Sequence, residues 1–244
     1  FEQSLYKLGW SLYMQGRYAE ALDPFFAYLE TLPGPLSPES IPAAEPSPLE
    51  REQVTELLDV ISSCFAHLGG VQAAKRFFDS GPSRSYERDI YTALARWYEE
   101  QQQISLAGET WLFLVQRAPL APDAPSLTGR TLQLYQAAGF ERLALATRHQ
   151  FVDDYGPRGE FWSHHETADY PDELRLVGES LEYLGNYYHR KVLDVPRAGY
   201  ALAAERYYRD YLSWFGEDDA ADEIRFQLAE LLAEEERYAE AYDC

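Results

Sequence analysis

The sequence predicts an all-α fold built from consecutive helical hairpins, and three of its features support that prediction. Apolar residues recur with the 3.6-residue period of amphipathic helices along most of the 244 residues. Glycine occurs where the hairpins would turn, at Gly16, Gly69 and Gly139. Stretches rich in proline and serine, which cannot continue a helix, separate some of the hairpins. We therefore expect at least about ten helices and no β-sheet.

The first hairpin, at residues 2–33, shows the pattern most completely. Its defining residues are Leu5, Leu8, Gly9, Leu12, Gly16, Tyr18, Ala21, Phe25 and Pro33. Gly9 and Ala21 are small where the two helices would approach closely, while the leucines and Phe25 would fill the contact. This arrangement resembles the tetratricopeptide repeat, a helix–turn–helix unit. The resemblance implies a right-handed superhelical solenoid.

Further repeats follow the first, so we interpret residues 1–244 as a single repeat solenoid. They cover residues 50–81, 86–119, 124–156, 173–216 and 220–244. The third repeat carries Gln102 at its turn, where glycine is usual. The fourth has Arg148 where the aromatic residue is expected, which makes this repeat atypical. In the fifth, the second helix is displaced around Pro196, because proline interrupts a helix.

Two segments interrupt the repeats. Residues 34–48 are rich in proline and serine and are predicted to form an extended surface loop. Residues 156–172 break the helical period and contain His164–Asp169, a cluster with metal-ligating residue types. A zinc-protease helix needs His-Glu-x-x-His, but here Asp169 replaces the second histidine and Pro171 ends any helix. We therefore favour a solvated loop over a metal site.

The charge of the chain restricts its partners. With 21 basic and 41 acidic residues, the formal net charge is −20. Such a field repels phosphate backbones and anionic lipid headgroups, so we expect no nucleic-acid partner. No apolar run approaches the roughly 20 residues that span a bilayer, so we expect no direct membrane insertion. The expected partner is a protein or peptide, basic or amphipathic in character.

Motifs that would indicate catalysis are missing from the sequence. It contains neither a glycine-rich phosphate-binding loop nor a Gly-x-Ser-x-Gly nucleophile elbow. Its two cysteines, Cys64 and Cys244, form no CxxC motif, and Cys64 is expected to be a buried small residue. We therefore expect no catalytic residue, no bound metal and no cofactor.

The resemblance implies that a partner binds the concave face of the solenoid, which residues of the first helices line. The residues at these positions that we expect to bind a peptide are Tyr6, Trp10, Tyr13, Arg96, Arg130, Tyr183, Asn186 and His189. Tyr6, Trp10 and Tyr13 form a stripe opposite the leucines of the first helix, although these rings would equally suit contact with a preceding repeat. The carboxylate clamp of co-chaperone members is not expected, since Glu182 stands where that clamp needs lysine.

The predicted function is that of a non-catalytic interaction scaffold, which binds a partner helix or extended peptide. The alternative is a structural spacer or oligomerisation element of a larger protein, with the ends of the repeat array as the contact surface. Both suit a piece of a longer chain, because Phe1 and Cys244 fall inside repeat-like patterns. Irregular spacing and long second helices resemble bacterial cell-envelope members, which favours a periplasmic or envelope location over the cytoplasm.

Overall fold

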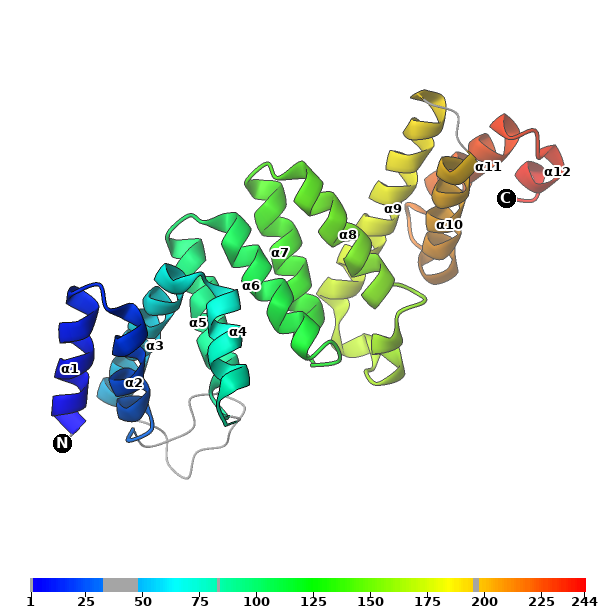
Figure 1. Cartoon of the computed structure of the whole chain (residues 1–244). Helices are drawn as coiled ribbons and strands as arrows, with labels where there is room; N and C mark the ends of the chain where they lie inside the picture. Colours follow the sequence, from blue (N-terminus) through cyan, green and yellow to red (C-terminus); the bar gives the residue numbers. More distant parts are fainter. Residues whose placement is uncertain (1, 33–47, 83, 195–197) are drawn as a thin grey trace. The chain divides into compact units, whose positions relative to one another are not determined.

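The computed structural model describes residues 2–32, 48–82, 84–194 and 198–244 (Figure 1). Over these ranges the chain forms twelve α-helices and two short 3-10 helices, with no β-strand. The prediction of an all-α fold is therefore confirmed. The surface loop predicted at 34–48 lies outside the described residues except for Pro48, which begins a helix.

By compactness the chain divides into an N-terminal unit, Phe1–Ala118, and a C-terminal unit, Pro119–Cys244. The N-terminal unit contains α1 (Glu2–Met14), α2 (Tyr18–Leu29), α3 (Pro48–Leu68), α4 (Val71–Ser80), α5 (Glu87–Glu100) and α6 (Ile104–Arg117). The C-terminal unit contains α7 (Ala124–Ala137), α8 (Glu141–Tyr155), α9 (Pro171–Asp194), α10 (Ala198–Phe215), α11 (Ala221–Glu234) and α12 (Tyr238–Tyr242). The arrangement of all hairpins as a single right-handed solenoid remains a prediction.

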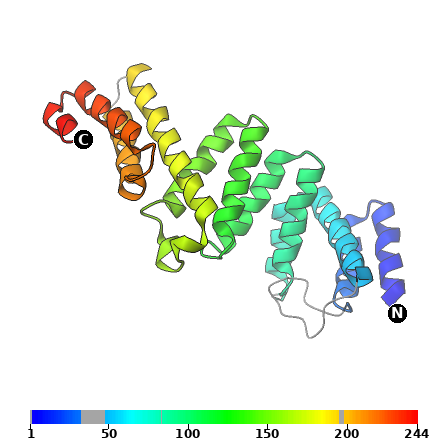
Figure 2. The same ribbon diagram turned by 180° about the vertical axis from the view of Figure 1, so that it is seen from behind.

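Consecutive helices pair as hairpins, as in α9 and α10, which Figure 2 shows side by side. In two hairpins a glycine of the first helix lies against an aromatic ring of the second. A Cβ atom added to Gly9 would lie 2.6 Å from the Phe25 ring, and one added to Gly185 would lie 2.5 Å from the Tyr208 ring. Only glycine permits this approach, which brings the two helix backbones close together.

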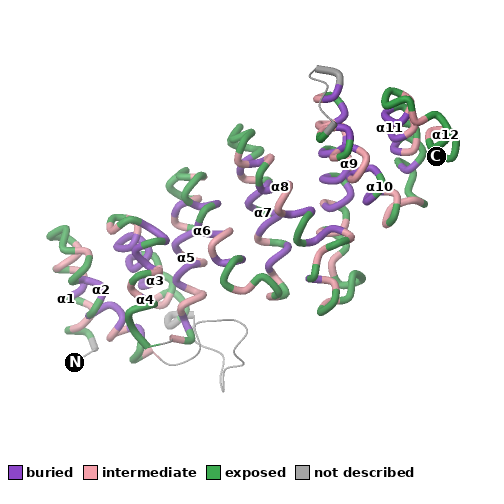
Figure 3. The backbone as a smooth tube through the Cα atoms, turned by 45° about the vertical axis from the view of Figure 1, so that its right-hand side comes forward, coloured by how far each residue is buried: buried purple, intermediate pink, exposed green. Residues whose placement is uncertain are grey.

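The expected small residues of the second helices are also in place. Ala21, Ala74, Ala107 and Ala204 are all fully buried, as the repeat pattern predicts. Figure 3 shows buried residues concentrated within the paired helices, while the turns are exposed. The core of each unit therefore lies between the helices of its hairpins and between neighbouring hairpins.

The turns adopt the backbone conformation that their glycines predict. Gly16, Gly69 and Gly139 have φ angles of +72°, +110° and +72°. Two other turns place a residue with a side chain in the left-handed region, Gln102 at φ 57° and Glu236 at φ 60°. A side chain is disfavoured there because its Cβ atom approaches a carbonyl oxygen.

Replacing Gln102 by glycine should stabilise the protein. Left-handed backbone costs a residue with a Cβ about 1–2 kcal/mol, and part of that gain is offset by the greater freedom of unfolded glycine. We expect the free energy of unfolding to rise by about 0.5–1 kcal/mol, measured by urea denaturation followed by circular dichroism. The matched control is Gln101→Gly at φ −79°, which should give no gain. Equal effects of the two changes would contradict this account.

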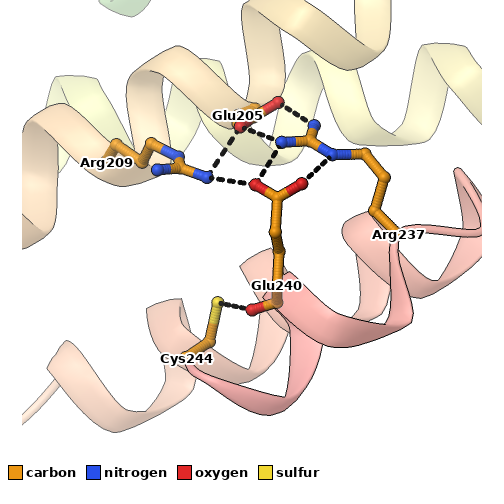
Figure 4. A network of polar contacts seen from close by, with 5 residues as sticks. All are labelled: Glu205, Arg209, Arg237, Glu240 and Cys244. Carbon is orange, nitrogen blue, oxygen red and sulfur yellow. Dashed lines mark hydrogen bonds and ion pairs between the residues drawn. The ribbon is translucent and has the colours of Figure 1, made fainter.

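The last hairpin is joined to the preceding one by a network of charged side chains (Figure 4). Arg237, at the start of α12, donates to Glu205 of α10 at 2.6 Å and to Glu240 at 2.6 Å. Arg209 of α10 contacts both carboxylates, at 2.9 and 3.4 Å. The hydrogen bond from Arg237 lowers the pKa of Glu205 despite its partial burial. The network therefore fixes a helix that is too short to hold its place by apolar contact.

The segment 156–172 is more ordered than the sequence predicts. It contains the 3-10 helices η1 (Glu160–Ser163) and η2 (Thr167–Asp169). Phe161 is buried, and the ring of His165 stacks on it at 4.1 Å. The solvated-loop interpretation therefore holds for the exposed His164 and Asp169 but is wrong for His165. His165 departs from the prediction because its ring stacks on Phe161, and the hydrophobic effect holds this pair of rings against the end of α8.

Candidate binding surface

The first helices of successive hairpins are neighbours within each unit. In the N-terminal unit α3 lies against α5, and two side-chain hydrogen bonds join α1 to α3. In the C-terminal unit α9 contacts both α7 and α11. In each unit we call the surface formed by its first helices the first-helix face, which means α1, α3 and α5 in the N-terminal unit and, separately, α7, α9 and α11 in the C-terminal unit. It carries the residues that the sequence nominates for binding.

The aromatic stripe of α1 is partly exposed and is positioned by its neighbours. The Tyr6 hydroxyl donates to Glu56 Oε1 at 2.6 Å, and the Tyr13 hydroxyl hydrogen-bonds to Ser63 Oγ at 2.9 Å. The Trp10 ring meets the Phe25 ring edge to face, with 6.1 Å between centroids. The partial burial of these rings therefore comes from α2 and α3.

The opposite side of α1 differs from the expectation. The sequence assigns Leu5, Leu8 and Leu12 to the contact between α1 and α2, but Leu8 is 50% exposed and the other two are half-buried. The hydrogen bonds of the tyrosines to α3 orient the aromatic side of α1 toward that helix. Leu8 is consequently turned toward solvent, and its assignment to the helix contact is wrong.

Tyr6 also lines a cleft on the first-helix face of the N-terminal unit. The cleft has a volume of about 340 Å³ and is lined by Gln3, Tyr6, Lys7, Tyr28, Gln53 and Glu56. The Tyr6 and Tyr28 rings lie 5.4 Å apart. Two rings with polar groups around them suit an amphipathic segment, because each ring offers a large apolar surface. Arg96, the other nominated residue of this unit, lies exposed on α5.

Asn186 and His189 are bound into a hydrogen-bond network of the C-terminal unit. The Tyr208 hydroxyl donates to Asn186 Oδ1 at 2.9 Å, and His189 Nδ1 lies 3.2 Å from the same hydroxyl. His189 Nε2 lies 3.3 Å from Glu234 Oε2 of α11. Burial raises the pKa of Tyr208, so its hydroxyl keeps its proton and can donate. His189 is only 6% exposed and thus serves mainly to join α9 to α10 and α11.

Two clefts lie beside α9, and one of them borders this network. Asn186, His189, Arg190 and Glu230 line a cavity of about 350 Å³ between α9 and α11. The exposed Arg130 lines a smaller one, of about 160 Å³, between α7 and α9. The nominated residues of the C-terminal unit therefore lie on the first-helix face, but in separate clefts.

Another cleft of this unit contains Arg148, a residue that the sequence did not nominate. Tyr183, which is 45% exposed, borders a cavity of about 630 Å³ together with Arg142 and Arg148. The guanidinium of Arg148 lies over the Tyr183 ring at 4.2 Å from its centroid. One feature of the sequence could have identified Arg148, since it is an arginine at a position where the other repeats have an aromatic residue. That anomaly marked an atypical repeat, although position alone did not indicate a binding role.

The described residues offer little sign of reactive chemistry. Cys64 is fully buried, and burial raises the pKa of its thiol to about 12. Because the thiolate is the nucleophile, this cysteine is unreactive near neutral pH, as the sequence predicts for a buried small residue. Within the described ranges no group of three histidine, cysteine or acidic residues is arranged to hold a metal ion.

Hydropathy identifies no described helix that is by itself long and apolar enough to cross a membrane. Arg51–Leu68 and Val71–Ser80 meet the length and composition criterion only as a pair, across a bend of 104°.

Similarity to known proteins is found among solved structures. No family model matches the sequence, and no curated protein matches it. A solved structure that is similar is described as "Podosopora anserina putative kinesin light chain nearly identical TPR-like repeats". It is 10% identical, with 99% of this chain and 90% of that chain covered at a TM-score of 0.31. The hairpins, with their glycine turns and buried alanines, make the described part of this chain an all-α array of helical hairpins.

Proposed function

We propose that this protein is a non-catalytic scaffold that binds a partner helix or an extended peptide across its first-helix face. Helical-repeat folds generally act in this way, because stacked repeats present a continuous surface to a partner protein. The observation that carries the proposal is the position of the clefts, which lie between successive first helices in both units. In the N-terminal cleft the partly exposed Tyr6 and Tyr28 supply apolar anchor surface.

The N-terminal cleft is the preferred anchor site for an amphipathic partner. The tyrosines at its rim would contact an apolar side chain, while Glu56 would attract a basic one. The net charge of −20 extends that attraction over the whole chain. Binding of a basic peptide should accordingly weaken as salt rises, because screening at physiological ionic strength limits exposed charges to a range of about 8 Å.

The second candidate function is that of a spacer or oligomerisation element. Large apolar side chains are exposed on the last hairpins, with Leu202 on α10, Phe226 on α11 and Tyr242 on α12, the last 91% exposed. Exposed apolar residues of this kind favour contact with another protein surface. Analytical ultracentrifugation separates the two functions, since a self-associating spacer would sediment as an oligomer without any peptide.

The scaffold is tested by selecting peptides from a random displayed library against the purified chain. The double variant Tyr6→Ala with Tyr28→Ala removes both rings of the N-terminal cleft. We expect its affinity for the selected peptides to fall by about ten-fold or more. The matched control is Tyr242→Ala, an exposed tyrosine outside the cleft, which should bind normally. Equal binding by both variants, with unchanged helical circular dichroism and melting temperature, would contradict the proposed site.

A further inference from the structure

The 630 Å³ cavity beside Arg148, named here the Arg148 cleft, differs in charge from the rest of the molecule. Its ionisable lining consists of Arg142, Arg148 and Glu141, with the hydroxyl-bearing rings of Tyr183 and Tyr187 beside them. The lining thus carries two guanidinium groups and one carboxylate, in a chain whose net charge is −20. A cleft of this composition attracts an anionic group, although the field of the whole chain repels one.

Arg148 occupies a position that belongs to the core in the other hairpins. The corresponding residues of the second helices, all buried aromatics, are Phe25, Phe78, Trp111 and Tyr208. In the fourth hairpin Arg148 takes that place, and the residue is only 6% exposed. An aromatic residue would fill this space at no electrostatic cost, whereas a buried charge is expensive unless it is paired.

Within the described residues, Arg148 forms no ion pair. Its Nη1 donates to the neutral Ser180 Oγ at 3.2 Å, and its guanidinium stacks on Tyr183. Glu179 is the carboxylate that acts on it electrostatically, but Glu179 itself pairs with Arg175 at 2.8 Å. An arginine has five N–H donors, so most of those of Arg148 are not used by the protein. The group is therefore buried, charged and short of partners at the wall of a cleft.

We propose that the Arg148 cleft binds a carboxylate group, presented by an acidic side chain or by the chain end of a peptide. A carboxylate is planar and accepts two parallel hydrogen bonds from a guanidinium. Tyr183 lies against the face of the Arg148 guanidinium, and Ser180 accepts from only one of its N–H groups. Arg142 supplies a second positive charge at the rim. A monoanion suits this site better than a phosphate dianion, because Glu141 and the acidic field penalise the second charge.

The inference rests on the proposed function in one respect, namely that the carboxylate belongs to a peptide. It refines the expected partner to a basic or amphipathic segment that carries one acidic anchor. The anchor site lies at a core position of a second helix. It is thus distinct from the first-helix positions of the co-chaperone clamp, where Glu182 replaces the required lysine.

The test uses the full chain with labelled arginine side chains and follows the Arg148 Nε–H resonance by nuclear magnetic resonance. Titration with acetyl-glutamate amide should shift this resonance saturably, whereas the neutral acetyl-glutamine amide should not. Acetyl-alanine, which offers only a terminal carboxylate, distinguishes a chain end from a side chain. No saturable shift with either carboxylate would overturn the proposal. Tighter binding of inorganic phosphate would overturn the choice of a carboxylate.

Variants separate binding from structure. We expect Arg148→Met to lower the affinity for acetyl-glutamate amide by about ten-fold or more. The affinity is measured in this variant from the resonances of Tyr183 and Arg142. The control Arg190→Met, an exposed arginine of α9 that lines another cleft, should bind normally. If Arg148 is kept for a ligand, Arg148→Met should melt at the same temperature as the parent or higher, since an apolar side chain suits the buried position. Equal binding by Arg148→Met and Arg190→Met would overturn the proposal.

A second variant keeps the test decisive if Arg148→Met does not fold. Arg142→Met changes an exposed residue of the rim and should lower the affinity for the same probe several-fold. Unchanged affinity in that variant would count against the site. Because the probes are single amino acids, this result is independent of the peptide selection. Selected peptides that bind the first-helix face of Arg148→Met unchanged would leave the scaffold function standing and remove only the carboxylate anchor.

Discussion

Replacement of Trp111 by alanine should lower the free energy of unfolding by about 3–5 kcal/mol. Trp111 is one of the largest fully enclosed side chains, on α6, and its indole N–H donates to Glu99 Oε1 at 2.5 Å. Its loss would leave a cavity between α5 and α6 and remove a hydrogen-bond partner from Glu99. Urea denaturation followed by far-ultraviolet circular dichroism measures the change as a shift in the midpoint.

Two further variants identify the cause of that loss. Trp111→Phe keeps an aromatic ring and removes the N–H group, so it should cost clearly less than the alanine change. Leu106→Ala alters an exposed residue of the same helix, which is 40% exposed, and should stay within about 0.5 kcal/mol of the parent. If the urea midpoint of Trp111→Ala were as high as that of Leu106→Ala, Trp111 would not belong to the core between α5 and α6.

The same glycine-to-alanine change should have opposite effects at two positions of α9. At Gly185 the new Cβ atom would lie 2.5 Å from the Tyr208 ring. That ring is fully buried and its hydroxyl is held by Asn186, so it cannot move aside cheaply. We expect Gly185→Ala to cost about 1–3 kcal/mol through overpacking of the α9–α10 hairpin.

At Gly178, which is also buried, the new Cβ atom would meet the Phe215 ring at 3.6 Å, an ordinary van der Waals contact. Alanine is the better helix former, so Gly178→Ala should stabilise the protein by about 0.5–1 kcal/mol. Thermal and urea unfolding of the two variants side by side provide the comparison. Two changes of the same sign would show that the distance to the neighbouring ring does not govern these positions.

The hairpins and their turns were predictable from the sequence because they depend on neighbouring residues. Helical periodicity, the positions of Gly16 and Gly139 and the buried Ala21 all reflect local backbone and packing constraints. The same locality explains Gln102, whose place in the repeat pattern already assigned it to a turn. The interrupting segment was predicted less well, because the stacking of His165 on Phe161 involves a contact that no periodic pattern records.

The candidate site was predictable only in part. The sequence nominated the tyrosines Tyr6 and Tyr183, and both lie partly exposed beside clefts. It also nominated His189, which is instead buried between helices. The residue whose identity departs from the repeat pattern, Arg148, places a buried charge beside a cavity.

The sequence by itself thus determined that the chain forms helical hairpins, where they turn and which small residues lie between their helices. Only the tertiary structure decided which side of each helix is covered. The first helix carries apolar residues on both sides, so its amphipathic pattern is compatible with either orientation. The hydrogen bonds of Tyr6 and Tyr13 to the neighbouring hairpin select one orientation and leave Leu8 in solvent. Burial of a side chain depends on residues distant in the chain, and for that reason local sequence cannot specify it.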